Sequence, residues 1–87
     1  MRSPMPYFVY ILESELDGTY YIGATQDLKE RLERHNGGRS VYTKAKRPWS
    51  LVYFEEQENR SAALKRERQI KSVKSKRYIE KLVRTSR

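Results

Sequence analysis

The chain has 87 residues, no cysteine, one histidine and a formal net charge of +8 at neutral pH. A chain of this length supports one small domain, and the lack of cysteine excludes disulfides and thiolate metal sites. The lone histidine excludes zinc motifs with several histidines, so any bound metal would be a hard cation held by oxygen atoms.

The longest apolar run covers residues 7–12. It is far shorter than the roughly 20 residues of a membrane-spanning helix, and too short for the core of a signal peptide. We therefore expect a cytoplasmic protein that does not associate with membranes. We expect residues 1–87 to form one domain, with its core at about 7–84.

Positive charge is concentrated in the last third of the chain. Residues 60–87 contain 11 basic and 2 acidic residues, whereas residues 1–59 contain 8 basic and 9 acidic residues. Such asymmetry favours a polyanionic partner, with nucleic acid ahead of an anionic membrane. The alternative is a solvated helical face that is kept soluble by its charge.

Two strands are predicted first, at residues 7–13 and 19–24, because both runs are rich in Tyr, Phe, Val and Ile. Asp17-Gly18 between them is a strong turn signal. The two strands should form an antiparallel hairpin with Tyr10 and Tyr21 on paired strands.

A helix should follow, capped at its start by Asp27, with Glu30 completing a capping box, and ended by Gly37-Gly38. At about 100° per residue, one face of this helix points toward the sheet. That face carries Leu28, Arg31, Leu32 and His35.

The rest of the chain contains a basic connection at 39–47, a third strand at 49–54 and two helices. The first of these helices is capped by Asn59 or Ser61 and runs to about Val73, and the second covers 76–84 after Ser75. The predicted order is ββαβαα. The fold class is α+β, with a small three-stranded antiparallel sheet flanked by helices.

Arg31 and His35 are candidate functional residues because both lie on the apolar face of a helix. The Arg31 guanidinium either reaches solvent or a carboxylate, or it binds phosphate oxygens through its planar fork. The single histidine, His35, is either structural and suited to the helix C-terminus, or a proton donor or acceptor beside a phosphate.

Glu67 stands out as an acid within a strongly basic stretch. It can form an i,i+4 ion pair with Lys71, or it can anchor a Mg²⁺ or Mn²⁺ ion, which often needs only one or two carboxylates. Tyr42, within the basic connection, can stack on a base or line a groove.

These residues together resemble the GIY-YIG endonuclease domain, found in homing endonucleases, some restriction enzymes and the nuclease subunit of bacterial excision repair. Phe8-Val9-Tyr10 stands in the GIY position, without its glycine, and Tyr21-Ile22-Gly23 stands in the YIG position. Arg31, His35 and Glu67 follow in the order of the family. The resemblance covers about residues 7–77 and is closest to a small single-domain subgroup.

The resemblance implies phosphodiester hydrolysis with one Mg²⁺ or Mn²⁺ ion held by Glu67. We expect the substrate to be DNA that is branched or irregular. Arg31 would bind a phosphate oxygen and His35 would assist proton transfer. Tyr10 or Tyr21 would orient or deprotonate the attacking water, and a nearby cation would have to favour the phenolate.

The backbone of the nucleic acid is expected to contact a set of basic and aromatic residues, namely Arg39, Tyr42, Lys44, Lys46, Arg47, Lys71 and Lys74. Two alternatives remain open. One is a nucleic-acid-binding module without catalysis, and the other is a nuclease that depends on a protein partner for specificity.

Overall fold

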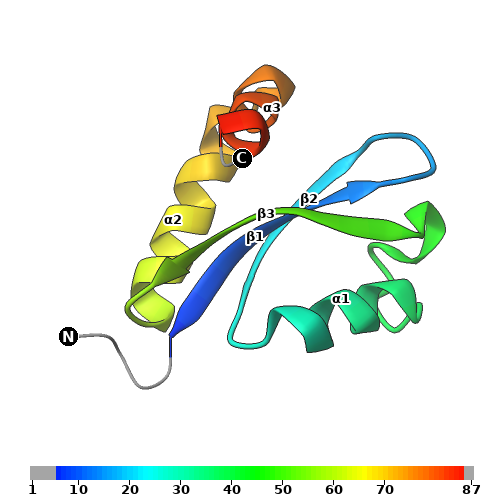
Figure 1. Cartoon of the computed structure of the whole chain (residues 1–87), viewed down its shortest axis with the longest axis horizontal. Coiled ribbons are helices and arrows are strands. Elements are labelled where there is room, and N and C mark those ends of the chain that lie inside the picture. Colours follow the sequence, from blue (N-terminus) through cyan, green and yellow to red (C-terminus); the bar gives the residue numbers. More distant parts are fainter. Residues whose placement is uncertain (1–5, 86–87) are drawn as a thin grey trace.

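The computed structural model describes residues 6–85. Its elements are β1 (Tyr7–Ser14), β2 (Tyr20–Thr25), α1 (Leu28–Asn36), the short 3₁₀ helix η1 (Lys44–Lys46), β3 (Trp49–Gln57), α2 (Arg60–Val73) and α3 (Lys76–Thr85) (Figure 1). The predicted ββαβαα order and α+β class are confirmed.

The sheet has three antiparallel strands in the order β2-β1-β3, so β1 is central and β2 is an edge strand. Tyr10 of β1 faces Gly23 of β2 and Phe54 of β3. The register with β3 shifts between Ile11 and Leu12. α1 lies on one face of the sheet, and α2 and α3 lie on the other (Figure 1).

Two apolar clusters occupy the two faces, because successive side chains of a strand point in opposite directions. The cluster under α2 and α3 contains Val9, Ile11, Ile22, Ala63, Ile70 and Val83. The cluster under α1 contains Tyr10, Leu12 and Trp49, with Leu28 and Leu32 packed against it. The central strand β1 contributes to both.

The start of α1 agrees only in part with the predicted capping box. The Asp27 carboxylate accepts a hydrogen bond from the Glu30 amide at 3.0 Å, as expected for an N-cap. The Asp27 amide, however, donates to the Thr25 hydroxyl at 3.1 Å instead of to Glu30. The Glu30 carboxylate instead pairs with Arg34 at 3.2 Å. Gly37 ends the helix, as predicted.

The two later helices begin with side-chain caps. Asn59, one of the two residues considered, caps α2 by accepting from the Ala62 amide at 2.9 Å. The Ser75 hydroxyl accepts from the Tyr78 amide at 3.2 Å at the start of α3. Both caps satisfy amides that would otherwise lack a helical partner.

β3 is longer than predicted and extends through Gln57. The added residues include Glu55, which is stabilised by α2 because its carboxylate accepts a hydrogen bond from Arg66 at 2.7 Å. Glu55 also accepts hydrogen bonds from Tyr53 and Gln57. A half-buried ion pair thus allows a carboxylate inside the strand.

Val73 does not belong to the apolar stripe with which α2 packs on the sheet. It is 47% exposed, whereas Ala63 and Ile70 are fully buried. Val73 is the last residue of α2, and Lys74 then adopts a left-handed conformation with φ 52° that redirects the chain into α3. The stripe therefore ends one turn earlier.

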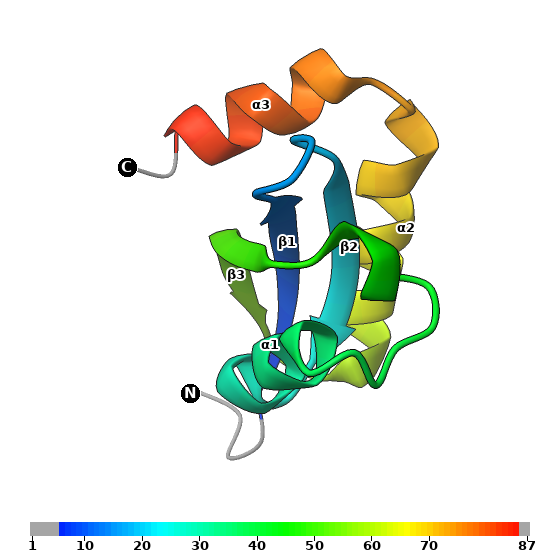
Figure 2. The same ribbon diagram turned by 90° about the vertical axis from the view of Figure 1, so that its right-hand side faces the viewer.

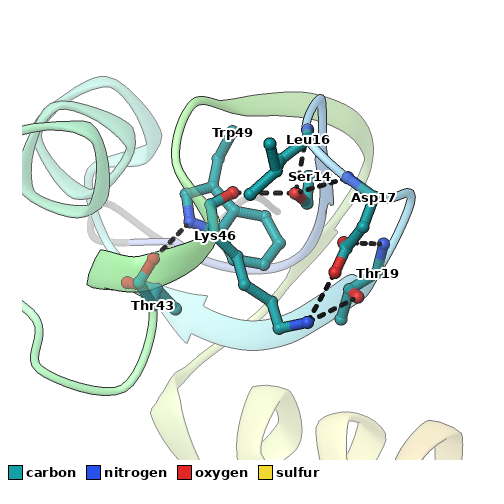
Figure 3. A network of polar contacts seen from close by, with 7 residues as sticks. All are labelled: Ser14, Leu16, Asp17, Thr19, Thr43, Lys46 and Trp49. Atoms are coloured by element: carbon teal, nitrogen blue, oxygen red, sulfur yellow. Dashed lines mark hydrogen bonds and ion pairs between the residues drawn. The ribbon is translucent and has the colours of Figure 1, made fainter.

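The β1–β2 hairpin is tied to η1 by a polar network (Figure 3). The Ser14 hydroxyl donates to the Lys46 carbonyl at 2.7 Å and accepts from the amides of Leu16 and Asp17. The Lys46 ammonium lies 2.5 Å from the Asp17 carboxylate and also contacts the Thr19 hydroxyl. These contacts hold the 38–47 loop against the hairpin.

The same loop is tied to the end of α1. The indole nitrogen of Trp49 donates to the Thr43 carbonyl at 2.9 Å. The Asn36 side chain accepts from the Trp49 amide at 2.6 Å and donates to its carbonyl at 3.0 Å. The loop is thus braced at both of its ends.

Candidate active site

Five predicted site residues come from four elements that meet at the edge strand β2. Figure 2 shows α2 running alongside β2, with α1 across the end of the sheet. Tyr10 is on β1, Tyr21 on β2, Arg31 and His35 on α1, and Glu67 on α2. Tyr10 and Tyr21 lie on the same face, and their ring centroids are 6.3 Å apart.

The phenol ring of Tyr10 packs directly against Gly23. A Cβ atom at Gly23 would lie 2.5 Å from the Tyr10 hydroxyl oxygen and 2.6 Å from its Cζ atom. Both distances are far below van der Waals contact, so the ring crosses directly over the edge strand. Tyr10 occupies the space that a side chain at position 23 would need, which explains why Tyr21-Ile22-Gly23 ends in glycine.

His35 lies between the two tyrosines and a threonine. Its Nε2 atom is 3.2 Å from the Tyr10 hydroxyl, and its Nδ1 atom is 2.7 Å from the Thr43 hydroxyl. Its ring centroid is 4.8 Å from that of Tyr21. The side chain is 3% exposed, which places it inside the fold as the helical phase of α1 predicted.

The surroundings of His35 favour a neutral imidazole. Burial lowers the pKa of His35 below its usual 6.5, and the charges of Arg31 and Arg34 lower it further. The lowered pKa disfavours a charged ring at the helix C-terminus, which was part of one interpretation of His35. A neutral ring can accept a proton.

Arg31 is neither fully solvated nor tightly paired. Its Nε atom is buried and, within residues 6–85, has no hydrogen-bond partner. The same atom lies 3.9 Å from a Glu30 carboxylate oxygen, a long contact. Arg31 also lines a hollow of about 360 Å³ together with residues from β2 and the start of α2. A cation with spare donors beside an open hollow can bind an anion.

The phenol of Tyr10 does not ionise easily. Burial raises the pKa of Tyr10 to about 12, and the neighbouring Tyr21 adds to this shift. Arg31 lowers the pKa of Tyr10, but the effect of burial outweighs it. Arg31 alone therefore does not meet the condition, set out above, that a nearby cation favour the phenolate.

Glu67 lies close enough to Tyr10 for its negative charge to raise the pKa of that phenol. Its side chain is 18% exposed, and its Oε2 atom is 2.6 Å from the Lys71 ammonium. Glu67, the predicted metal ligand, thus also forms the predicted i,i+4 ion pair with Lys71. Within residues 6–85 there is no cluster of three or more acidic or histidine side chains.

The donor set around Glu67 fits a hard divalent cation. A half-buried carboxylate supplies an oxygen ligand of the kind that Mg²⁺ and Mn²⁺ prefer. One protein carboxylate suffices when water and phosphate oxygens complete the coordination shell.

Several predicted nucleic-acid ligands make contacts inside the protein. Arg39 lies 3.8 Å from the Glu30 carboxylate, and Arg47 donates to the Lys44 carbonyl at 2.9 Å. Lys71 pairs with Glu67, and Lys46 pairs with Asp17 in the hairpin network. Lys44 and Lys74 are exposed. Lys46 in particular stabilises the fold, a role that the sequence did not indicate.

Tyr42 has the exposure that a contact with nucleic acid requires. It is 87% exposed, and its ring centroid is 6.3 Å from that of Tyr21. The adjacent Val41 is 91% exposed. The tip of the basic loop therefore places an aromatic ring beside the candidate site.

Thr43 and Trp49 are parts of the site that sequence reasoning missed. Thr43 is 1% exposed and bonds to His35, and Trp49 holds the Thr43 backbone. A threonine in a polar basic loop carries no periodic signal of burial. The only hint was a tryptophan directly after Pro48, which was assigned to a strand.

No helix within residues 6–85 is long and apolar enough to cross a membrane.

Comparisons with known proteins identify the family of this chain. A family model described as the GIY-YIG catalytic domain matches residues 6–80. UPF0213 proteins from the Mu3 and Mu50 strains of Staphylococcus aureus are each 48% identical over 67 residues, which covers 76% of this chain and 80% of each relative.

A solved structure is similar over nearly the whole chain. The solution NMR structure of a UPF0213 protein from Bacillus halodurans matches with a TM-score of 0.59 and 34% identity, covering 93% of this chain and 85% of that one. The family match, the relatives and the solved structure agree, and this chain belongs to the GIY-YIG domain family of nucleases.

Proposed function

We propose that this protein is a divalent-metal-dependent endonuclease that hydrolyses phosphodiester bonds in DNA, preferably branched or irregular DNA. The observation that carries the proposal is the contact of Tyr10 with a neutral His35, next to Arg31 and Glu67. This set combines a proton acceptor, a fixed cation and an oxygen ligand.

Glu67 would hold one Mg²⁺ or Mn²⁺ ion, with water and phosphate oxygens as the remaining ligands. The bound ion would neutralise charge that develops on the phosphate and its leaving oxygen. Lys71 is then the side chain that the ion must displace or share, because it contacts the Glu67 carboxylate at 2.6 Å.

Arg31 would bind a non-bridging oxygen of the scissile phosphate. Its guanidinium is half-exposed, and its Nε donor has no partner within the described residues. Donors placed before the reaction begins stabilise the transition state without reorganising.

Tyr10 would activate the attacking water, with His35 as the final proton acceptor. With a pKa of about 12, free phenolate is populated at only roughly one part in 10⁵ at pH 7. We therefore assign a coupled transfer: the Tyr10 oxygen takes a proton from water while the Tyr10 proton moves to Nε2 of His35. The water oxygen bonds to phosphorus as the bond to the leaving oxygen breaks.

The His35 contact favours Tyr10 over Tyr21 as the residue that handles the water proton, a choice that the sequence left open. Tyr21 packs over the imidazole ring at 4.8 Å and lies beside Tyr42. It would help to position His35 and to guide the substrate strand.

The preference for irregular DNA rests on the exposed Tyr42 and on the open edge of the sheet. An aromatic ring on a basic loop can stack on an unpaired base, and such stacking is worth about 1–3 kcal/mol. Branches, flaps and damaged sites offer unpaired bases, whereas regular duplex does not. A protein partner that adds selectivity is compatible with this arrangement.

The test is metal-dependent cleavage of junctions, flaps, hairpins, single strands and plasmid by wild type, Glu67→Gln and Glu80→Gln. Glu80 is the other acid of the basic segment and lies on α3, so it is the matched control. We expect Glu67→Gln to lose cleavage while it keeps its fold and DNA binding, because the i,i+4 pair contributes only about 0.2–0.5 kcal/mol.

Wild-type cleavage rates in Glu67→Gln would show that this residue does not hold a catalytic ion. If wild type binds DNA but cuts none of the substrates with any divalent ion, the non-catalytic binding module replaces the proposed enzyme. Activity that appears only after addition of a cell extract would instead favour the partner-dependent nuclease.

A further inference from the structure

We propose that Thr43 is a positioning residue that holds His35 in the tautomer with its proton on Nδ1, so that Nε2 is free to accept the proton of Tyr10. This inference rests on the proposed function and adds a residue to it. The hydroxyl of Thr43 lies 2.7 Å from Nδ1, and the hydroxyl of Tyr10 lies 3.2 Å from Nε2. The three side chains therefore form one line of hydrogen bonds.

The direction of these bonds follows from the available donors and acceptors. A guanidinium carries only donors, so Arg31, whose charge reaches the Tyr10 hydroxyl, cannot take the Tyr10 proton. That proton needs an acceptor because the Tyr10 side chain is 1% exposed. Nε2 of His35 is that acceptor, so it must be unprotonated.

A neutral imidazole with a bare Nε2 carries its proton on Nδ1. That proton points at the Thr43 oxygen, which can accept it. Without the Thr43 hydroxyl, the buried Nδ1–H would have no partner, and moving the proton to Nε2 would become the cheaper arrangement. Nε2–H could no longer accept from Tyr10.

The position of the Thr43 hydroxyl is fixed by its backbone. The Thr43 carbonyl accepts from the Trp49 indole at 2.9 Å and from the Lys46 amide at 3.2 Å. Its amide donates to the Ser40 carbonyl at 3.2 Å. Thr43 and Trp49 are 1% and 3% exposed. A residue with its backbone held in this way keeps its side chain in a single place.

The tautomer can be read directly, because His35 is the single histidine of the chain. Protein labelled with ¹⁵N-histidine gives one ring spectrum, in which protonated and unprotonated nitrogens are well separated. We expect Nδ1–H in wild type and in Thr43→Ser. We expect Thr43→Val, which keeps the shape but lacks the hydroxyl, to move the proton wholly or partly to Nε2.

Thr25→Val is the matched control, since Thr25 is also buried, at 4% exposure, and its hydroxyl bonds to Asp27. It removes a buried threonine hydroxyl elsewhere and should leave the His35 tautomer unchanged. In cleavage assays, kcat of Thr43→Val should fall about 10- to 100-fold with little change in KM, as for other residues that orient a functional histidine. Thr43→Ser, which keeps the hydroxyl, should retain most of the wild-type kcat.

An Nε2–H tautomer in wild type would overturn the inference, and so would Thr43→Val with an unchanged spectrum. If Thr43→Val does not fold, the wild-type and Thr43→Ser spectra still decide the tautomer. The spectra need no substrate, so they separate a failure of this inference from a failure of the proposed nuclease activity.

Discussion

Gly23 sets how closely the Tyr10 ring can approach the edge strand. In Gly23→Ala, the new methyl group would lie 2.5 Å from the Tyr10 hydroxyl oxygen, so either the ring or β2 must move. We expect a loss of about 1–3 kcal/mol in the free energy of unfolding, typical of overpacking. We also expect a fall in cleavage of more than about tenfold, because a displaced hydroxyl leaves His35.

Urea unfolding and plasmid nicking measure these two effects separately. If Gly23→Ala keeps both the stability and the cleavage rate of wild type, the Tyr10 ring does not pack as closely against Gly23 as the structure shows.

Because His35 is the single histidine of the chain, its contribution to the pH dependence of stability can be measured separately. The pKa of His35 is lowered in the folded state, chiefly by burial and then by Arg31 and Arg34. As pH falls below about 6.5, the unfolded chain binds a proton before the folded protein does, so stability decreases. Above that pH the contribution is fully present.

Thermal midpoints of wild type and His35→Gln between pH 7.5 and 5.5 test this. Wild type should lose more stability on acidification than the variant, because Gln does not titrate. Parallel curves for the two proteins would contradict the lowered pKa of His35.

At the scale of elements, Ser14 joins the hairpin to the 38–47 loop. Ser14→Ala removes a buried hydroxyl that serves one carbonyl and two amides (Figure 3). Leaving such groups unsatisfied should lower the free energy of unfolding by about 1–3 kcal/mol. Loosening the loop should also lower cleavage, since Thr43 lies in it.

The matched control is Ser50→Ala on β3, because the Ser50 hydroxyl bonds to Glu15 in a solvent-exposed position. Ser50→Ala should change the free energy of unfolding very little. Chemical denaturation measures the free energy of unfolding of both variants. Equal losses would mean that the Ser14 network stabilises the fold no more than an exposed hydrogen bond does.

Local signals predicted the elements, and long-range contacts explain where those predictions were incomplete. Asp17-Gly18, Asp27, Asn59 and Gly37 act within a few residues, so the hairpin and the helix ends could be read from the sequence. The extension of β3 depends on Arg66, 11 residues away from Glu55. Such a pairing has no local signature.

The candidate site divides in the same way. The helical phase of α1 placed Arg31 and His35 on the sheet side, and the family resemblance added the roles of Tyr10, Tyr21 and Glu67. The sequence did not reveal that Tyr10 crosses Gly23 or that Thr43 reaches His35, because both depend on the packing of separate elements. The raised pKa of Tyr10 also depends on packing, since burial by separate elements outweighs the effect of Arg31.

At the scale of the whole molecule, the basic segment 60–87 should dominate binding to DNA. We expect affinity to fall steeply between 50 and 200 mM salt, with a slope set by the number of phosphates contacted. Replacing an exposed basic residue in contact with phosphate should reduce that slope by roughly 0.9. Lys74→Ala, at the junction of α2 and α3, should show this change.

Lys29→Ala is the control, because Lys29 is an exposed cation on α1, away from the basic segment. Fluorescence anisotropy over a salt series measures both slopes. Binding that does not respond to salt would contradict an electrostatic interface, as would equal slopes for the two variants.

The two apolar clusters on opposite faces of the sheet have a consequence for engineering. The apolar side chains of α2 and α3, such as Ile70 and Val83, are separated by the sheet from Leu28 and Leu32 of α1. Substitutions on the two sides share few neighbours, so their effects on folding should be close to additive. A designer can therefore raise the melting temperature by repacking the α2–α3 side, and leave the layer that carries Tyr10 and His35 untouched.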